Sequence, residues 1–189
     1  MKNGSVTLRY IQESDIDNYT RWSTVETEWC DWDAPWETWE DGELVTWQRS
    51  LLGKTPDVYY KLEIETLDGW HIGWVSSYNM DGDITGRAVG LDIPPVEARG
   101  HGYGADALGL FMAYLFMHDC VNVLYTQTWS GNTAMLRLAE KIGFTEVRRI
   151  RNHREVRGTS YDALTFSMGK DEFFTKHPAL RMMETKMNQ

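Results

Sequence analysis

The sequence has few cysteines and no long apolar segment. Cys30 and Cys120 are the only cysteines among 189 residues, and neither lies in a CxxC pair or near a cluster of histidines and cysteines. This pattern excludes a secreted disulfide framework and a structural zinc site, and we expect two free thiols and no metal. No run of eighteen apolar residues is present, and the opening segment MKNGSVTLRY lacks the apolar region of a secretory signal. We therefore expect a cytoplasmic protein without a membrane partner.

Basic residues are also scarce. The chain has 19 lysines and arginines against 28 aspartates and glutamates, which gives a formal net charge of −9 at pH 7. Because affinity for nucleic acids comes largely from lysine and arginine, we expect no nucleic-acid partner. The charge is uneven, since residues 26–43 hold eight acidic residues and no basic one, whereas residues 148–157 hold five arginines. We expect these two regions to attract different ligands.

The length and an apolar content of 42% favour a single domain, which we assign to residues 1–170, followed by a tail over residues 171–189 that either folds back or stays loose. Alternation of apolar and polar residues predicts strands, and a three-to-four spacing predicts helices. The first half should contain strands at 6–11, 59–65, 70–79 and 84–93, and helices at 14–22 and 40–52.

In the second half of the chain, helices and strands are expected to alternate. Leu108, Phe111, Met112, Leu115 and Phe116 predict a helix with one apolar face that packs on a sheet. A strand over 123–128, a helix over 132–142 that ends at Gly143, and a hairpin around Gly158 should follow.

The segment RGHGYG, residues 99–104, places three glycines at the start of the helix that contains Leu108. The first N–H groups of a helix have no partner inside it and lie at the positive end of the helix dipole, so they bind phosphate well. A diphosphate could reach the amides of residues 100–104 directly, with Arg99 adding a charge. The alternative is a tight loop that needs positive φ angles. Rossmann and P-loop motifs do not fit: the first lacks its preceding strand, and only Gly53, Lys54 and Thr55 match the second.

RGHGYG matches RxxGxG/A, the pyrophosphate-binding motif of the GNAT superfamily of acyl-CoA-dependent N-acetyltransferases. NTAMLRLAEKIGF, residues 132–144, is similar to a later motif of that family, in which an Asn opens a helix ending in EKxGF. The pattern is most similar to the branch of ribosomal-protein N-terminal acetyltransferases. The resemblance implies an α/β (α+β) fold with a mixed, mostly antiparallel sheet of six or seven strands flanked by helices and splayed at the acetyl-CoA site.

By this resemblance the co-substrate is acetyl-CoA, and the acceptor is a primary amine that attacks the thioester directly. The pantetheine arm would pair with backbone from Leu91 to Ile93, the diphosphate would lie on the glycine segment, and Asn132 would bind the arm while capping its helix. The residues expected to bind the cofactor are Leu91, Asp92, Ile93, Arg99, Gly100, His101, Gly102, Tyr103, Gly104, Ala105, Asn132 and Met135.

An alkyl ammonium must lose a proton before it attacks, and a carboxylate is the expected general base. Asp92 is our candidate, because strand alternation puts it on the face opposite Val89, Leu91 and Ile93; a solvent-facing strand residue is the alternative. Two family acids are missing, since Ala139 stands where many members have a tyrosine and Met135 where the ribosomal branch often has a serine. This departure leaves open a second hypothesis, a catalytically silent module that binds acyl-CoA.

In this fold the segment between the first and second strands lines the acceptor site. Here it alternates tryptophans with acidic residues, which suits a cation through cation–π and charge attraction, although such tryptophans often bury themselves. The substrate-binding candidates are Trp29, Asp31, Trp32, Asp33 and Trp36, with Trp39 nearby. We expect a small cationic amine, a polyamine, an aminoglycoside-like compound or a protein N-terminus as acceptor, and a homodimer is a further expectation. We expect the arginines of 148–157 to lie on the solvent-exposed face of a hairpin, or to contact an adenosine 3′-phosphate or a partner subunit.

Overall fold

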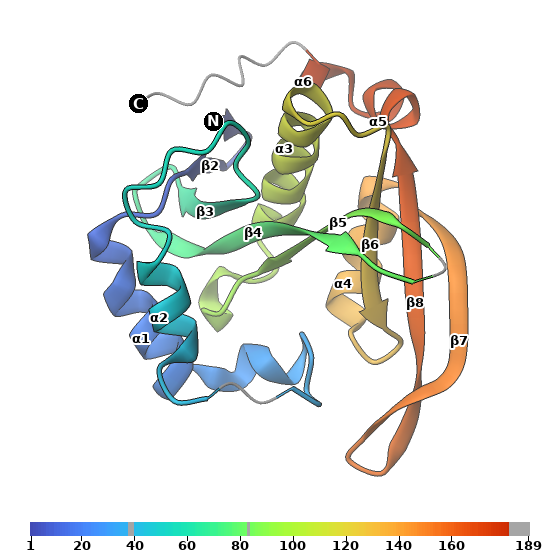
Figure 1. Cartoon of the computed structure of the whole chain (residues 1–189), viewed down its shortest axis with the longest axis horizontal. Coiled ribbons are helices and arrows are strands. Elements are labelled where there is room, and N and C mark those ends of the chain that lie inside the picture. Colours follow the sequence, from blue (N-terminus) through green and yellow to red (C-terminus); the bar gives the residue numbers. More distant parts are fainter. Residues whose placement is uncertain (38–39, 83, 182–189) are drawn as a thin grey trace.

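The computed structural model describes residues 1–37, 40–82 and 84–181, so Trp39 and residues 182–189 of the predicted tail lie outside the described part. The described residues form one sheet of eight strands in the order β1-β2-β3-β4-β5-β6-β8-β7 (Figure 1). Within it, neighbouring strands are antiparallel except β5 and β6, which are parallel. The predicted mixed, mostly antiparallel sheet is confirmed, and the strand beyond the predicted number is a two-residue β1. The strands are β1 (Lys2–Asn3), β2 (Val6–Arg9), β3 (Lys61–Thr66), β4 (His71–Met80), β5 (Gly86–Asp92), β6 (Val123–Trp129), β7 (Thr145–Val156) and β8 (Thr159–Gly169).

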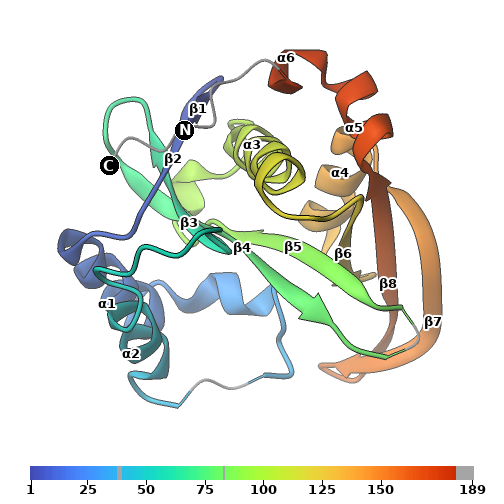
Figure 2. The same ribbon diagram turned by 45° about the horizontal axis from the view of Figure 1, so that its top comes forward.

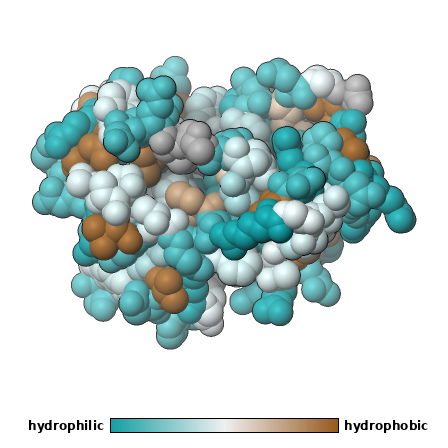
Figure 3. All heavy atoms as spheres, turned by 90° about the horizontal axis from the view of Figure 1, so that it is seen from below, coloured by the Kyte–Doolittle hydropathy of each residue, from teal (hydrophilic) through white to brown (hydrophobic). Residues whose placement is uncertain are grey.

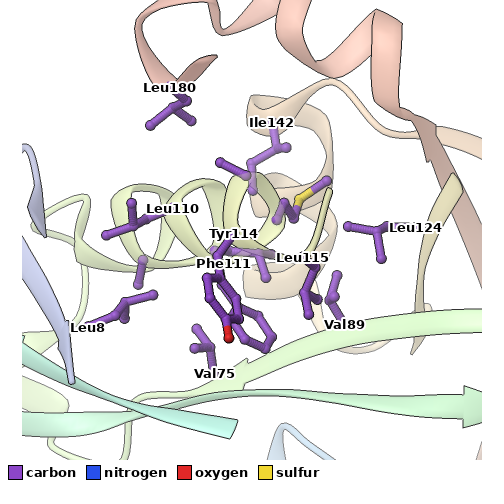
Figure 4. Close-up of a cluster of buried hydrophobic side chains, with 14 of the residues drawn as sticks. Leu8, Val75, Val89, Leu110, Phe111, Tyr114, Leu115, Leu124, Ile142 and Leu180 are labelled. Carbon is purple, nitrogen blue, oxygen red and sulfur yellow. The ribbon is translucent and has the colours of Figure 1, made fainter. Parts of the chain in front are cut away.

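Helix α3 (Tyr103–His118) forms the centre of the main core. Apolar side chains of the sheet, among them Leu8, Val75 and Val89, pack against it (Figure 4). The sequence predicted one apolar face, but residues 107–116 of this helix are buried without interruption. The prediction was wrong on this point because further helices cover the sides of α3 that face away from the sheet.

The C-terminal segment supplies part of that cover. Helix α5 (Lys170–Lys176) places the Phe173 ring 5.4 Å from the ring of Phe116 on α3, and helix α6 (Pro178–Arg181) buries Leu180. Of the two alternatives left open for the tail, folding back therefore holds for residues 171–181. These residues complete the core.

The opposite face of the sheet carries α1 (Ile16–Thr24) and α2 (Glu43–Arg49), so helices cover both faces (Figure 2). Here a second apolar cluster forms from Tyr19, Trp22, Trp29, Leu44 and Trp74. A buried polar network fixes α1 to the sheet. The Tyr19 hydroxyl of α1 donates to the Glu63 carboxylate on β3 at 2.5 Å, and the His71 ring on β4 contacts the same carboxylate at 2.9 Å. The Arg9 guanidinium on β2 pairs at 2.7 Å with Asp15, directly before α1.

Local sequence signals set the ends of α4 (Thr133–Ile142). The Asn132 side chain accepts a hydrogen bond from the Met135 amide at 2.9 Å, and Gly143 ends the helix with φ 93°. Both cysteines are free thiols, as expected. Among the described residues, no helix combines the length and apolarity needed to cross a membrane. On the face seen from below, hydrophilic residues and residues of intermediate hydropathy cover most of the area, and hydrophobic residues form small separate groups (Figure 3).

Candidate active site

The sheet opens between β5 and β6. In the described chain these strands pair at Arg87 with Leu124 and at Ala88 with Tyr125, and they diverge beyond that point (Figure 1). Within the described residues, the backbone from Gly90 to Asp92 has no strand partner on its β6 side, and the predicted splay of the sheet is confirmed. Pro94 and Pro95, one residue beyond β5, cannot donate the hydrogen bonds that would extend the ladder.

A cleft of about 660 Å³ occupies this opening. Its size is that of a small-molecule site. Four parts of the chain meet there: β5 and the glycine segment, the ends of β4 and β6, the start of α4, and the acidic tryptophan-rich loop. The lining includes Trp29, Trp32, Asp33, Ser76, Tyr78, Leu91, Asp92, Ile93, Arg99, Gly100, Gly102, Tyr103, Gly104, Ala105, Thr126, Asn132 and Met135.

The glycine segment presents free backbone donors to the cleft. The amides of residues 100–104 donate to no acceptor in the described chain, and they lie where the 16-residue helix α3 begins. Gly100 and Gly102 have φ of +82° and +88°, and a Cβ on either would meet no backbone within 4 Å. Unpaired amides at a helix N-terminus, with open space before them, suit a diphosphate.

The charge of Arg99 is directed elsewhere. Its guanidinium donates to the carbonyl oxygens of Ile93 at 2.9 Å and Pro94 at 2.8 Å, and it forms an ion pair with Glu28. Arg99 thus ties the end of β5 to the acidic loop. His101 is exposed and stacks on Tyr103, with ring centroids 5.6 Å apart, and it is not among the lining residues.

Two cationic residues that the sequence analysis did not single out line the cleft beside the glycines. Arg137 and Lys141 stand one turn apart on α4, and a Cβ on Gly102 would lie 3.9 Å from the Lys141 ammonium nitrogen. Their spacing of four, which puts both side chains on the same face of the helix, was the available signal. It was not specific, because such pairs also occur on ordinary solvent-exposed helix faces.

Besides Glu28, which pairs with Arg99, two carboxyl groups line the cleft, those of Asp33 and Asp92. Asp92 is at the end of β5, and burial together with the nearby Asp33 carboxylate raises its pKa well above the ordinary value, while the Lys61 ammonium opposes the rise. Loss of hydration in the cleft and the Glu37 carboxylate raise the pKa of Asp33 as well. Both carboxyls therefore hold their protons at a higher pH than aspartates in open solvent do.

Asn132 has two structural roles at the cleft. Its side-chain oxygen caps α4, and its amide nitrogen donates to the Trp32 carbonyl oxygen at 2.7 Å. The indole nitrogen of Trp129 donates to the same oxygen at 3.0 Å. These bonds hold the acidic loop against the β6–α4 side of the cleft.

The acceptor candidates separate into two groups. Trp29, Trp32 and Asp33 line the cleft, and Trp29 is also buried in the second apolar cluster. Asp31 and Trp36 contact the β7–β8 hairpin instead.

The arginine-rich and acidic regions, expected to attract different ligands, meet each other in the structure. Arg157 pairs with Asp31 at 2.6 Å, and the Arg154 guanidinium lies 4.7 Å from the centroid of a Trp36 ring. Arg149 pairs with Glu146 on its own strand. Within the described residues, part of the positive charge of this hairpin is therefore neutralised by the chain itself.

The first comparison with known proteins concerns sequence. The family model described as "Acetyltransferase (GNAT) domain" matches residues 5–145. The chain belongs to this family of acetyltransferases, which confirms the prediction made from the glycine and NTAMLRLAEKIGF motifs. A curated relative, the SPbeta prophage-derived uncharacterized N-acetyltransferase YokL of Bacillus subtilis (strain 168), is 28% identical over 79 residues. That alignment covers 42% of this chain and 45% of YokL, so the chain matches less than half of its relative's length.

Solved structures resemble the whole fold. Spermidine N-acetyltransferase from Vibrio cholerae, in complex with CoA and spermine, has a TM-score of 0.70 at 16% identity and covers 91% of this chain and 99% of its own. The ribosomal-protein-S5-alanine acetyltransferase from Vibrio fischeri has a TM-score of 0.71 at 15% identity, with 92% and 97% covered. At such identities the likeness shows the fold.

Proposed function

We propose that this chain transfers an acetyl group from acetyl-CoA to a cationic primary amine. One observation carries the proposal: a single cleft joins five free backbone amides at a helix N-terminus to a pair of carboxyl groups with raised pKa values. The amides suit a diphosphate, and the carboxyls suit an ammonium. A GNAT acetyltransferase needs both kinds of site within reach of one thioester.

The residues at the glycine segment fit the co-substrate. The amides of residues 100–104 would bind the diphosphate, and Arg137 and Lys141 would add positive charge beside it. The open backbone edge of Leu91 to Ile93 would pair with the amide groups of the extended arm, as an added strand pairs with a sheet edge. Acetyl-CoA, when bound, supplies the activated acetyl thioester.

Asp92 would act as general base. The incoming ammonium gives one proton to the Asp92 carboxylate, directly or through water. The neutral nitrogen then forms a bond to the acetyl carbon as the carbon–sulfur bond breaks, and the further proton that the nitrogen loses as it becomes an amide passes to the departing thiolate. A pKa raised by burial and by Asp33 brings Asp92 closer to the pKa of the amine, which makes it a stronger base than an exposed aspartate. The departing sulfur needs little help, since a thiol with a pKa of about 8.5 is a fair leaving group. Tyr103 in the cleft wall is one proton donor within the site.

Asp33 would hold the cationic acceptor. It lies in the cleft wall with Trp29 and Trp32, so charge attraction and the faces of the indole rings both favour a cation there. A protonated Asp33 would lose this attraction. Binding of the ammonium should therefore lower the pKa of Asp33 and strengthen as the pH rises.

The test is thiol release from acetyl-CoA across a panel of primary amines, measured as a function of pH. We expect turnover whose acid limb has an apparent pKa above the ordinary aspartate value of about 3.9. Asp92→Asn should reduce kcat by about a hundredfold or more, as expected for loss of a general base. The control is Asp68→Asn, an exposed aspartate in the β3–β4 turn, which should leave the profile unchanged.

The silent-module hypothesis predicts a different outcome. A protein of that kind binds CoA in calorimetry yet releases no thiol with any amine. The carboxyl pair favours the enzyme, because a module that only binds acyl-CoA has no use for two mutually repelling carboxyl groups with raised pKa values in the wall of the cleft.

A further inference from the structure

A second cavity of about 900 Å³ adjoins the cleft. This side pocket lies between α2, the segment of residues 51–60, and strands β3 and β4. Ser76 and Tyr78 line both cavities, so the two share a wall on β4. The two cavities therefore lie next to each other along β4.

The walls of the side pocket are largely aromatic and aliphatic. Trp47, Tyr60 and Tyr78 line it while 41%, 38% and 44% of their surfaces stay exposed, and Leu51 and Val58 complete the apolar wall. Large apolar side chains that converge on one cavity and remain open to water form a surface that gains free energy when an apolar group covers it.

The charges of the side pocket do not suit a second cation. The charged residues in its described lining are Lys54, Lys61 and Glu63. Lys61 and Glu63 neutralise each other at 2.6 Å, with side chains 8% and 1% exposed, and Lys61 also donates to the Tyr19 hydroxyl at 2.7 Å. Lys54 leaves the pocket with a net positive charge. A polyamine, which would place another ammonium here, is disfavoured.

Strand register gives the distance from Asp92 to the wall that the two cavities share. Asp92 pairs with Trp74, and Ser76 and Tyr78 follow Trp74 by two and four residues along β4. At about 3.3 Å per residue, these positions lie about 7 and 13 Å from the level of Asp92. An apolar group attached to the reacting amine by a short chain would span this distance.

We propose that the acceptor is a primary amine carrying a large apolar group, best an aromatic ring, and that the side pocket binds this group. The inference rests on the proposed function, because it takes the amine to react beside Asp92. It separates an amine with an apolar tail from the polyamines and aminoglycoside-like compounds that the cleft alone would accept.

The experiment compares kcat/KM for 4-phenylbutylamine, n-butylamine and spermidine with acetyl-CoA. We expect 4-phenylbutylamine to be preferred over both others by about tenfold or more, the scale on which apolar pockets discriminate. Trp47→Ala should reduce the ratio of 4-phenylbutylamine to n-butylamine by about tenfold. Trp70→Ala is the matched control: Trp70 is 39% exposed and lines neither cavity, so the ratio should stay unchanged.

Equal kcat/KM for the phenyl and butyl amines, or a preference for spermidine, would overturn the inference while leaving the acetyltransferase proposal intact. If no amine is acetylated, the proposed function fails, and calorimetric titration of 4-phenylbutylamine into the CoA-loaded protein then decides the inference. Binding that Trp47→Ala weakens and Trp70→Ala does not would support the side pocket as the binding site. Absence of binding would refute it.

Discussion

Replacing Gly102 by alanine separates a phosphate-binding role of the glycine segment from a purely conformational one. Gly102 has φ +88°, and a Cβ there would meet, among the described atoms, the flexible end of Lys141 at 3.9 Å. Gly69, in the turn between β3 and β4, has φ +89° and no described atom within 4 Å of a Cβ. The two positions therefore impose the same backbone strain, and they differ in that Gly102 lines the cleft.

The strain fixes the expected loss of stability. A non-glycine residue in the left-handed region costs roughly 1–2 kcal/mol, so Gly102→Ala and Gly69→Ala should lower the free energy of unfolding by similar amounts of that size. Urea denaturation measures both. A loop that merely requires positive φ predicts this result and nothing further.

A diphosphate on the amides adds a second effect at Gly102 alone. The new methyl group projects into the cleft and displaces at least one charge-assisted hydrogen bond, worth about 1.5–3 kcal/mol. We therefore expect Gly102→Ala to weaken CoA binding about ten- to hundredfold in calorimetry, while Gly69→Ala binds CoA like the parent. Equal CoA affinity in the two variants would refute the assignment of residues 100–104 to the diphosphate.

Four other predictions concern charge and packing. Asp33→Asn should move the acid limb of kcat/KM to lower pH, because the Asp33 carboxylate raises the pKa of Asp92; an unmoved limb in the pH profile would contradict the pairing. The pKa of Asp92 is higher in the folded protein than the unfolded value of about 4, so folding favours the protonated carboxyl. The protein is therefore destabilised as the pH rises above about 4 and this carboxyl ionises. Asp92→Asn removes that penalty and should increase the melting temperature at pH 7 and not at pH 3. Lys61→Met leaves the ionised, buried Glu63 without its cation and should cost about 3–5 kcal/mol in denaturant unfolding. Phe173→Ala should cost about 3–5 kcal/mol in the same assay, and a loss below about 1 kcal/mol would show that α5 is not part of the core.

The family and the glycine segment could be predicted because their signals are local. Backbone conformation at Gly100 and Gly102, and the free amides that follow from a helix starting at Tyr103, depend on residues within one or two turns. The Asn132 cap and the Gly143 stop are local in the same way. Such features depend on short stretches of sequence, so motif and spacing were enough to predict them.

The burial of α3 shows where local patterns failed. Helices α5 and α6, more than fifty residues later in the chain, pack on sides of α3 outside the one apolar face that the sequence predicted. The apolar residues of α3 do not identify the element that packs on them, because the hydrophobic effect is not directional.

The sequence by itself determined that this chain belongs to the GNAT acetyltransferase family and that a loop suited to phosphate precedes its central helix. Only the tertiary structure decided that Asp33 and Asp92 face one cleft, that Arg137 and Lys141 stand beside the glycines, and that an apolar pocket adjoins the acceptor side. The reason is physical: a loop conformation is set by neighbours in the chain, whereas the distance between two charges, and with it their pKa values, depends on how separate strands and loops pack.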